Sequence, residues 1–136
     1  MELNKKLVVI ILSIAISISV SASFSSLGSS VPHYENLKVL SKNISSKELQ
    51  SIMVDDFEDG LGVTCGFCHA SKKDGHGLDF ASDAKPEKEI ARSMMRMTMG
   101  INQKYFKLKH PKIGNPELTV TCNTCHKGVA FPDGSN

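Results

Sequence analysis

The chain has few of the large side chains that usually fill a protein core. Its 136 residues include no tryptophan, two tyrosines and six phenylalanines. Small domains with little apolar surface to bury commonly depend on disulfides, a metal or another bound group for stability. The sequence therefore predicts a small domain that depends on more than its own side chains.

Several signatures of common enzyme and binding classes are also missing. The sequence contains no Gly-rich phosphate-binding loop, no Ser, His and Asp in a hydrolase order, and no acidic cluster with metal-ligand spacing. Its formal net charge is only +2. A balance this close to neutral gives no indication of nucleic acid, so we expect no nucleic-acid partner.

All four cysteines of the chain fall in two copies of one pattern. These are Cys65-Gly66-Phe67-Cys68-His69 and Cys122-Asn123-Thr124-Cys125-His126. Cys-x-x-Cys-His is the pattern to which haem is covalently attached. On a helix, residues i, i+3 and i+4 share a face, so two thiols can bond one porphyrin while the imidazole reaches its iron. We predict two covalently bound c-type haems, with thioethers at Cys65, Cys68, Cys122 and Cys125 and iron ligands at His69 and His126.

Other uses of four cysteines explain the pattern less well. A zinc site can be closed by two Cys-x-x-Cys pairs, but 53 residues separate Cys68 from Cys122, and zinc does not account for a histidine after both pairs. A thioredoxin-like redox pair calls for one motif in a βαβ context. Two structural disulfides are the remaining alternative. Haem attachment is strongly favoured over all three.

The N-terminus has the order of a secretory signal peptide. Lys5 and Lys6 precede an apolar run from Leu7 to Val20, and small residues follow up to Ala22. The run is short for a membrane-spanning helix, so we expect cleavage after residue 22. The alternative is an uncleaved anchor, through which alone we would expect the chain to contact a membrane. The expected location is the periplasm.

The remainder is long enough for one domain. Residues 23–35 read as a flexible leader, 36–131 as the two-haem domain, and 132–136 as a tail. Ser45 and Glu48 form a capping-box pattern that predicts a helix start, and Ile52, Met53 and Phe57 continue its apolar stripe.

A second, longer helix is predicted from Pro86. Apolar residues recur at helical spacing along it, at Ile90, Met94, Met97, Ile101 and Leu108. Residues 71–85 read as loop, and residues 118–121 are the only short strand candidate. The expected fold is all-α, a small multihaem cytochrome c of two pseudo-repeated units, each a helix, a turn and Cys-x-x-Cys-His.

The opposite face of each iron decides the function. A methionine thioether there gives a closed iron suited to electron transfer, whereas an open face permits small-ligand binding or peroxide chemistry. From the residues alone, Met53 is as consistent with packing as with ligation. Met94, Met95, Met97 and Met99 compete with one another for the second site.

Several segments resemble the cytochrome subunit of photosynthetic reaction centres and its relatives. They are residues 36–40 with 43–45, residues 78–83, residues 91–98 with Ile101 and Asn102, and Val120-Thr121-Cys122. The resemblance covers residues 36–131. It implies that each unit has a helix bearing an axial methionine, with Met53 as the first iron's ligand. The family pattern Arg-x-Met-x-x-Met-Thr implies Met94 for the second iron and leaves Met97 as packing.

Two departures from that family are visible. The reaction-centre subunit has four haems in a much longer chain, and the segment from Met94 to Cys122 is longer here. The alternatives at the second iron are therefore Met97 and His110, and ligation by His110 would give a bis-His haem of lower potential. His33 and His76 read as solvated.

The expected function is electron transfer between redox proteins or membrane electron-transfer complexes, without enzymatic activity. The alternative is a haem-based peroxidase or gas sensor with one open iron. Lys104, Lys107, Lys109 and Lys112 form the one local basic cluster. We interpret it as a solvated helix end, with a docking patch for an acidic redox partner as the alternative.

Overall fold

The computed structural model describes residues 33–132. The expected signal peptide, most of the leader and residues 133–136 lie outside this range. The elements in chain order are α2 (Ser46–Ser51), the π-helix η1 (Ile52–Asp59), α3 (Cys65–Cys68), β1 (Ala70–Ser71), β2 (Leu78–Asp79), α4 (Pro86–Phe106) and α5 (Cys122–His126). The described domain is small and mostly helical, as the sequence predicts.

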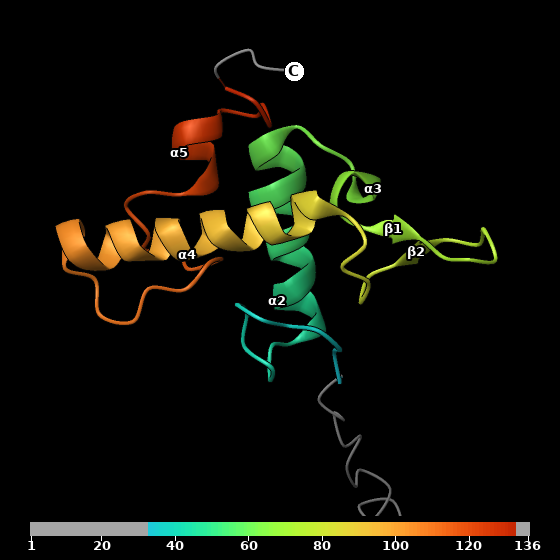
Figure 1. The fold of residues 1–136 in the computed structure, drawn as a ribbon. Coiled ribbons are helices and arrows are strands. Elements are labelled where there is room, and N and C mark those ends of the chain that lie inside the picture. The colour runs from blue at the N-terminus through green and yellow to red at the C-terminus, as the bar shows by residue number, and fades with distance from the viewer. Residues whose placement is uncertain (1–32, 133–136) are drawn as a thin grey trace, which may run out of the picture. The chain divides into compact units, whose positions relative to one another are not determined.

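The first helix begins where its cap predicts. The hydroxyl of Ser45 accepts a hydrogen bond from the backbone N–H of Glu48, at 3.2 Å. α2 then runs directly into η1, so the two form one rod (Figure 1). π-helical turns are rare and frequently occur at functional sites. Here the π-helix carries Met53 and Phe57, two members of the predicted apolar stripe.

The long helix α4 also begins as predicted, with Pro86 in its first turn. It ends at Phe106, because the next residue, Lys107, has a left-handed backbone (φ 60°), so Leu108 lies beyond the helix. Its buried side differs from the predicted apolar stripe: the buried residues are Lys88, Arg92, Met95, Thr98 and Asn102. Ile90, Met94 and Met97 are instead exposed.

Two short strands correct the prediction of a purely helical chain. β1 and β2 pair antiparallel, with Ala70 opposite Asp79, within a segment that mostly reads as loop. Residues 118–121, the one strand candidate of the sequence, form no strand. Their backbone groups bond to a side chain of α4 instead, as described below.

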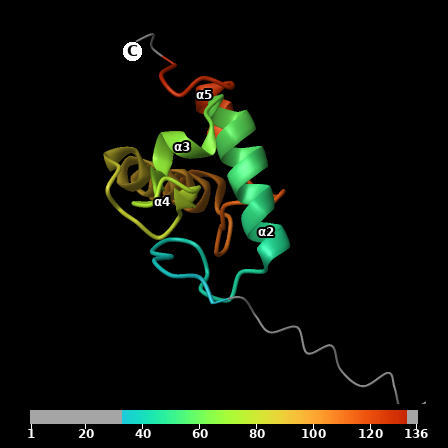
Figure 2. The same ribbon diagram turned by 90° about the vertical axis from the view of Figure 1, so that its right-hand side faces the viewer.

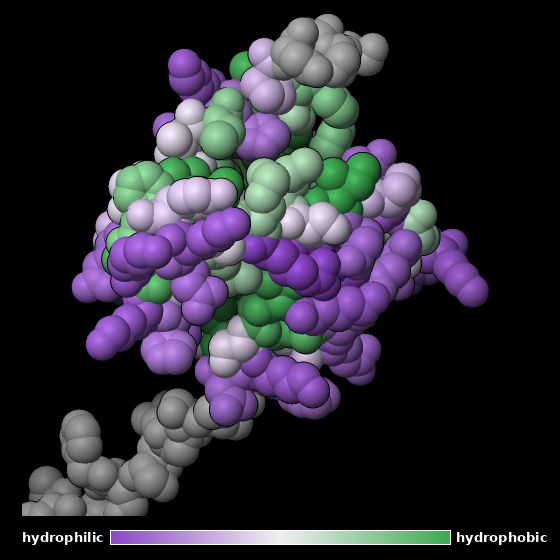
Figure 3. Space-filling model, turned by 60° about the vertical axis from the view of Figure 1, so that its left-hand side comes forward, coloured by the Kyte–Doolittle hydropathy of each residue, from purple (hydrophilic) through white to green (hydrophobic). Residues whose placement is uncertain are grey.

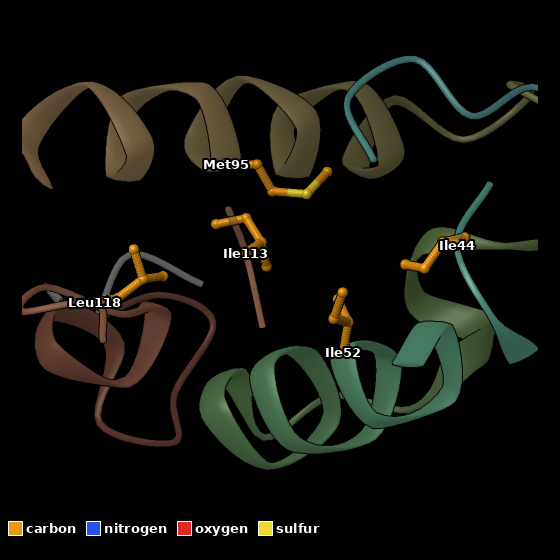
Figure 4. Close-up of a cluster of buried hydrophobic side chains, with 5 residues drawn as sticks. All are labelled: Ile44, Ile52, Met95, Ile113 and Leu118. Atoms are coloured by element: carbon orange, nitrogen blue, oxygen red, sulfur yellow. The ribbon is translucent and has the colours of Figure 1, made fainter. Parts of the chain in front are cut away.

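The hydrophobic core is small. Its buried apolar residues are Ile44, Ile52, Met95, Ile113 and Leu118. Figure 4 shows Met95 on α4 and Ile52 on the α2–η1 rod, with Ile113 between them. The core therefore joins the two longest helices and the segment before α5, and leaves much apolar surface outside it.

The short helices that carry the cysteines lie at the ends of the longer ones. α5 lies beside the C-terminal end of the α2–η1 rod in both ribbon views, and α3 packs against α4 (Figures 1 and 2). Among residues 33–132, no helix combines the length and apolarity needed to cross a membrane.

Candidate cofactor sites

Each Cys-x-x-Cys-His pattern forms a short helical turn. α5 contains Cys122, Cys125 and His126, so these three residues lie on one turn as the spacing predicts. α3 contains only the cysteine pair. His69 follows it with an extended backbone (φ −108°, ψ 130°), although its N–H still donates to the Cys65 carbonyl at 3.0 Å. The first imidazole therefore leaves the helix axis at a different angle from the second.

The cysteines do not assemble into a metal site or disulfides. None of the four forms a disulfide. In the described part of the chain, no group of three or more His, Cys, Asp or Glu side chains is placed to hold a metal ion. The zinc and disulfide alternatives therefore find no support in this geometry.

The first cavity brings a predicted ligand pair together. It has a volume of about 540 Å³ and is lined by residues of the N-terminal segment, the α2–η1 rod, the strand region and α4. Met53 and His69 both line it. His33, which the sequence suggests is solvated, lines it too while remaining exposed. A volume of this size is typical of small-molecule and cofactor sites.

The ring of His69 has an unsatisfied polar atom at this cavity. Its Nδ1 is buried and has no hydrogen-bond partner in the described structure, and its ring meets that of Phe80 edge-on with centroids 4.9 Å apart. Burial, followed by the charges of Lys88 and Arg92, lowers the pKa of His69. The neutral imidazole is the form that binds metals.

The second cavity gathers residues of the other motif. It has a volume of about 460 Å³ and is lined by Cys122, Cys125 and His126 together with Met94 and Met97. His110, the third candidate for the second iron, is exposed and lies outside both cavity linings. Met95, which also competes for this iron in the sequence, lines the cavity as well, so it contains three methionine candidates and not the histidine.

The imidazole of His126 is oriented by a hydrogen bond. Its Nδ1 lies 3.1 Å from the carbonyl oxygen of Val129. A carbonyl can only accept, so Nδ1 carries the proton and Nε2 keeps a free lone pair. Metal-ligating histidines commonly have this arrangement, which fixes both the tautomer and the ring angle.

Burial raises the pKa of two cysteine thiols, Cys68 and Cys122. Burial, followed by the charge of Asp56, raises the pKa of Cys122 to about 11. Burial and Glu87 likewise raise the pKa of Cys68, against an opposing effect of Lys85. Catalytic thioredoxin-like cysteines need a lowered pKa, so these environments disfavour that alternative.

Exposed apolar side chains surround the cavities. Ile90, Met94, Met97 and Phe131 line the second cavity, and Phe80, which is 62% exposed, lines the first. Hydrophobic residues accordingly lie on the surface among hydrophilic ones (Figure 3). A flat, mostly apolar group in each cavity would cover them. The second cavity is lined by both cysteines and the histidine of its motif, as one haem requires. The first cavity is lined by His69 and Met53 but by neither cysteine of its motif, and Cys68 lines the second cavity instead.

Asn102 ties the long helix to the second motif. The side chain is completely buried, and its Nδ2 donates to the carbonyls of Thr98 (2.9 Å) and Val120 (2.7 Å). Its Oδ1 accepts from the N–H groups of Thr119 (2.8 Å) and Val120 (3.1 Å). The amide therefore fixes the backbone just before Cys122 relative to the helix that carries Met94. The sequence offered one signal, a polar residue next to Ile101 in the apolar stripe.

Three glycines bring the flanks of the two motifs into backbone contact. The N–H of Gly128 donates to the carbonyl of Gly60 at 3.1 Å. A Cβ added to Gly62 would lie 2.1 Å from the carbonyl oxygen of Gly128. Gly62 also has a φ of +64°, which disfavours other residues. The approach to Cys65 and the exit from His126 are thus packed against each other.

The two Cys-x-x-Cys-His motifs and the cavities that their histidines line define the class as a c-type cytochrome. Residues 17–135 match the family model of the photosynthetic reaction centre cytochrome C subunit, and the chain belongs to this family. The resemblance inferred from the sequence is confirmed, and the family implies electron transfer.

One curated relative adds a distant match. Cytochrome c-554 of Chloroflexus aurantiacus (strain ATCC 29366 / DSM 635 / J-10-fl) is 33% identical over 98 residues. The match covers 72% of this chain and 21% of that protein, so the chain spans about a fifth of the relative's length. No solved structure matches the chain.

Proposed function

We propose that this chain is a two-haem electron carrier of the periplasm that does not itself transform a substrate. The observation that carries the proposal is that each cavity is lined by the histidine of a Cys-x-x-Cys-His motif and by at least one methionine. Histidine and methionine together close both axial positions of a haem iron and favour electron transfer over ligand binding.

The proposed roles follow the two pseudo-repeated units. Haem supplies reversible one-electron chemistry when bound. Cys65 and Cys68 would hold the first group, and Cys122 and Cys125 the second, through thioethers. The proposed iron ligands are Met53 and His69 at the first site, and Met94 and His126 at the second, where Met97 and His110 are the alternatives.

The surrounding residues would protect and orient these groups. Apolar side chains such as Phe57 and Ile101 exclude water from the cavities. The Val129 carbonyl holds the His126 ring at one angle, and Asn102 keeps the Met94-bearing helix aligned with the second motif. Burial and fixed ligands of this kind set the potential of a redox group.

The ligand assignment is tested by spectroscopy of the purified holoprotein. We expect two haems per chain, a weak red methionine–iron charge-transfer band in the oxidised protein, and no response to carbon monoxide after reduction. Met53→Ala should lower the potential of one haem and open that iron to carbon monoxide. Met99→Ala is the matched control, because Met99 packs against the core and lines neither cavity.

Other outcomes would redirect the assignment. Carbon monoxide binding by the unaltered protein would mean an open iron and would favour the peroxidase or gas-sensor alternative. An unchanged redox titration of Met53→Ala would remove Met53 from the first site. At the second site, the same measurement on Met94→Ala, Met97→Ala and His110→Ala identifies the ligand, which we expect to be Met94.

The export part of the proposal is supported by the signal-peptide pattern of residues 1–22. N-terminal sequencing of the protein from its native membrane and soluble fractions tests it. Cleavage after Ala22 would give a free carrier. An intact N-terminus in the membrane fraction would instead mean a tethered subunit, which differs from the free carrier only in its anchorage.

A further inference from the structure

The two cavities share part of their walls. Phe57, Ala91 and Met95 line both of them. Cys68, a member of the first motif, lines the second cavity. α4 therefore presents one side to each site, and the fixed charges along this helix act differently on the two.

The first cavity is lined by buried positive charge. Lys88 and Arg92 are 9% and 4% exposed and line this cavity only, together with the exposed Lys38 and Glu35. Arg92 pairs with Asp83 at 2.8 Å and with Glu89 at 2.9 Å. These carboxylates are 39% and 53% exposed, so solvent screens them more than the buried cations.

The charge along the lining of the second cavity has the opposite sign. Glu87 is the one acidic or basic side chain, histidine aside, among the described residues that line it. Asp56, on η1, acts on the Cys122 thiol from nearby.

We propose that this charge difference makes the first site the higher-potential one, so that electrons enter at the second site and leave from the first. The inference rests on the proposed two-haem carrier. Positive charge in a poorly solvated site favours the reduced state of the iron, which carries one positive charge fewer, and negative charge favours the oxidised state. Each transfer oxidises one iron and reduces the other by one electron, between a donor and an acceptor redox protein, and no covalent bond changes.

The experiment is a potentiometric titration of the holoprotein with soluble redox mediators. We expect two separate midpoint potentials. Met53→Ala assigns them, because Met53 lines only the first cavity. The potential that this substitution lowers should be the higher of the two in the unaltered protein.

Arg92→Gln tests the cause and has a close control on the same helix. Removing the buried cation should decrease the equilibrium constant for reduction at the higher-potential site about tenfold, which lowers that potential by ~59 mV for a one-electron couple. The other potential should change less. Arg96→Gln removes the same charge one turn along, from a side chain that is 50% exposed and lines neither cavity. It should leave both potentials nearly unchanged.

Glu87→Gln tests the effect of the negative charge at the second cavity. It should raise the lower potential and have less effect on the higher one. If Arg92→Gln fails to fold by circular dichroism, Lys88→Gln replaces it, with the same expected direction.

The inference is overturned if the first site has the lower potential, if Arg92→Gln and Arg96→Gln act equally, or if Glu87→Gln lowers the lower potential. A protein that lacks two reversible one-electron steps would overturn the proposed carrier function itself. Two reversible steps with the lower potential at the first site would overturn only the direction of transfer.

Discussion

At the scale of single residues, Asn102 has the clearest structural role. Its fully buried amide donates to two backbone carbonyls and accepts from two backbone N–H groups, in bonds that are buried or part-buried. Removing it leaves the N–H groups of Thr119 and Val120 and the Val120 carbonyl without this partner. Each buried group left unpaired costs ~1–3 kcal/mol.

We therefore expect Asn102→Ala to lower the free energy of unfolding by roughly 2–4 kcal/mol. Urea unfolding of the holoprotein followed by circular dichroism measures this. Gln103→Ala, at the exposed neighbouring position, is the control and should change little. If the two substitutions had equal effects, the amide would not stabilise the segment before Cys122.

The residues that the sequence could predict are those with a fixed spacing. The two Cys-x-x-Cys-His patterns name six candidate haem-binding residues outright, four for attachment and two for the irons, because the chemistry of attachment requires that order. Asn102 has no such signal, since the N–H groups of Thr119 and Val120 that it binds are 17 and 18 residues away in the sequence. The methionines are intermediate: the helical pattern finds them, but whether each one binds iron or packs stays a prediction.

At the scale of elements, the contact between Gly62 and Gly128 connects the two short helices α3 and α5. A side chain at Gly62 has no space beside the Gly128 carbonyl and also needs a positive φ. We expect Gly62→Ala to destabilise the holoprotein by more than ~1 kcal/mol, because the backbone strain alone costs about that much. Thermal unfolding of the holoprotein is the measurement.

Gly100→Ala provides the matched control. Gly100 lies inside α4, and a Cβ there would meet no atom within 4 Å. Replacing a helical glycine with alanine should stabilise the protein by ~0.5–1 kcal/mol. Substitutions of the same kind at these two glycines should therefore have opposite signs, and a neutral Gly62→Ala would show that the contact is not tight.

Element boundaries were predictable where a cap or a proline marks them. The Ser45 cap and Pro86 both begin helices in the structure. The π-helical register of η1 was not predictable, because nothing local in residues 52–59 distinguishes it from an α-helix. The predicted stripe of Ile90, Met94 and Met97 is also periodic, but it lines a cavity and not the core. Periodicity reports an apolar environment and does not say whether protein or cofactor provides it.

At the scale of the whole molecule, the core is too small to account for a stable fold. Five buried apolar residues join the longest helices in the described chain. Elsewhere the helices and loops line two large cavities. We expect a chain produced without haem attachment, with all four cysteines replaced by alanine, to be largely unstructured by circular dichroism. The haem-loaded protein is the control. A well-folded haem-free variant would contradict the dependence on haem.

The charge distribution of the molecule also indicates a kind of partner. Between Glu89 and Glu117 the sequence has no acidic residue, and Lys104, Lys107, Lys109 and Lys112 are all exposed near Tyr105 and Phe106. If an acidic redox protein docks there, its association rate should fall steeply with added salt. Replacing the four lysines with glutamine should remove that salt dependence, whereas replacing Lys42, Lys47, Lys72 and Lys73 should not. A salt-independent rate would favour the solvated helix end.

The backbone contact between Gly62 and Gly128 also limits how this domain can be divided. The two units follow one another in the sequence, and the hairpin between them looks like a natural place to cut the chain. Yet the first motif is packed against the exit of the second, and Phe57, Ala91 and Met95 belong to both cavities. Neither half would keep a complete cavity wall, so the smallest unit that an engineer could transplant is the pair.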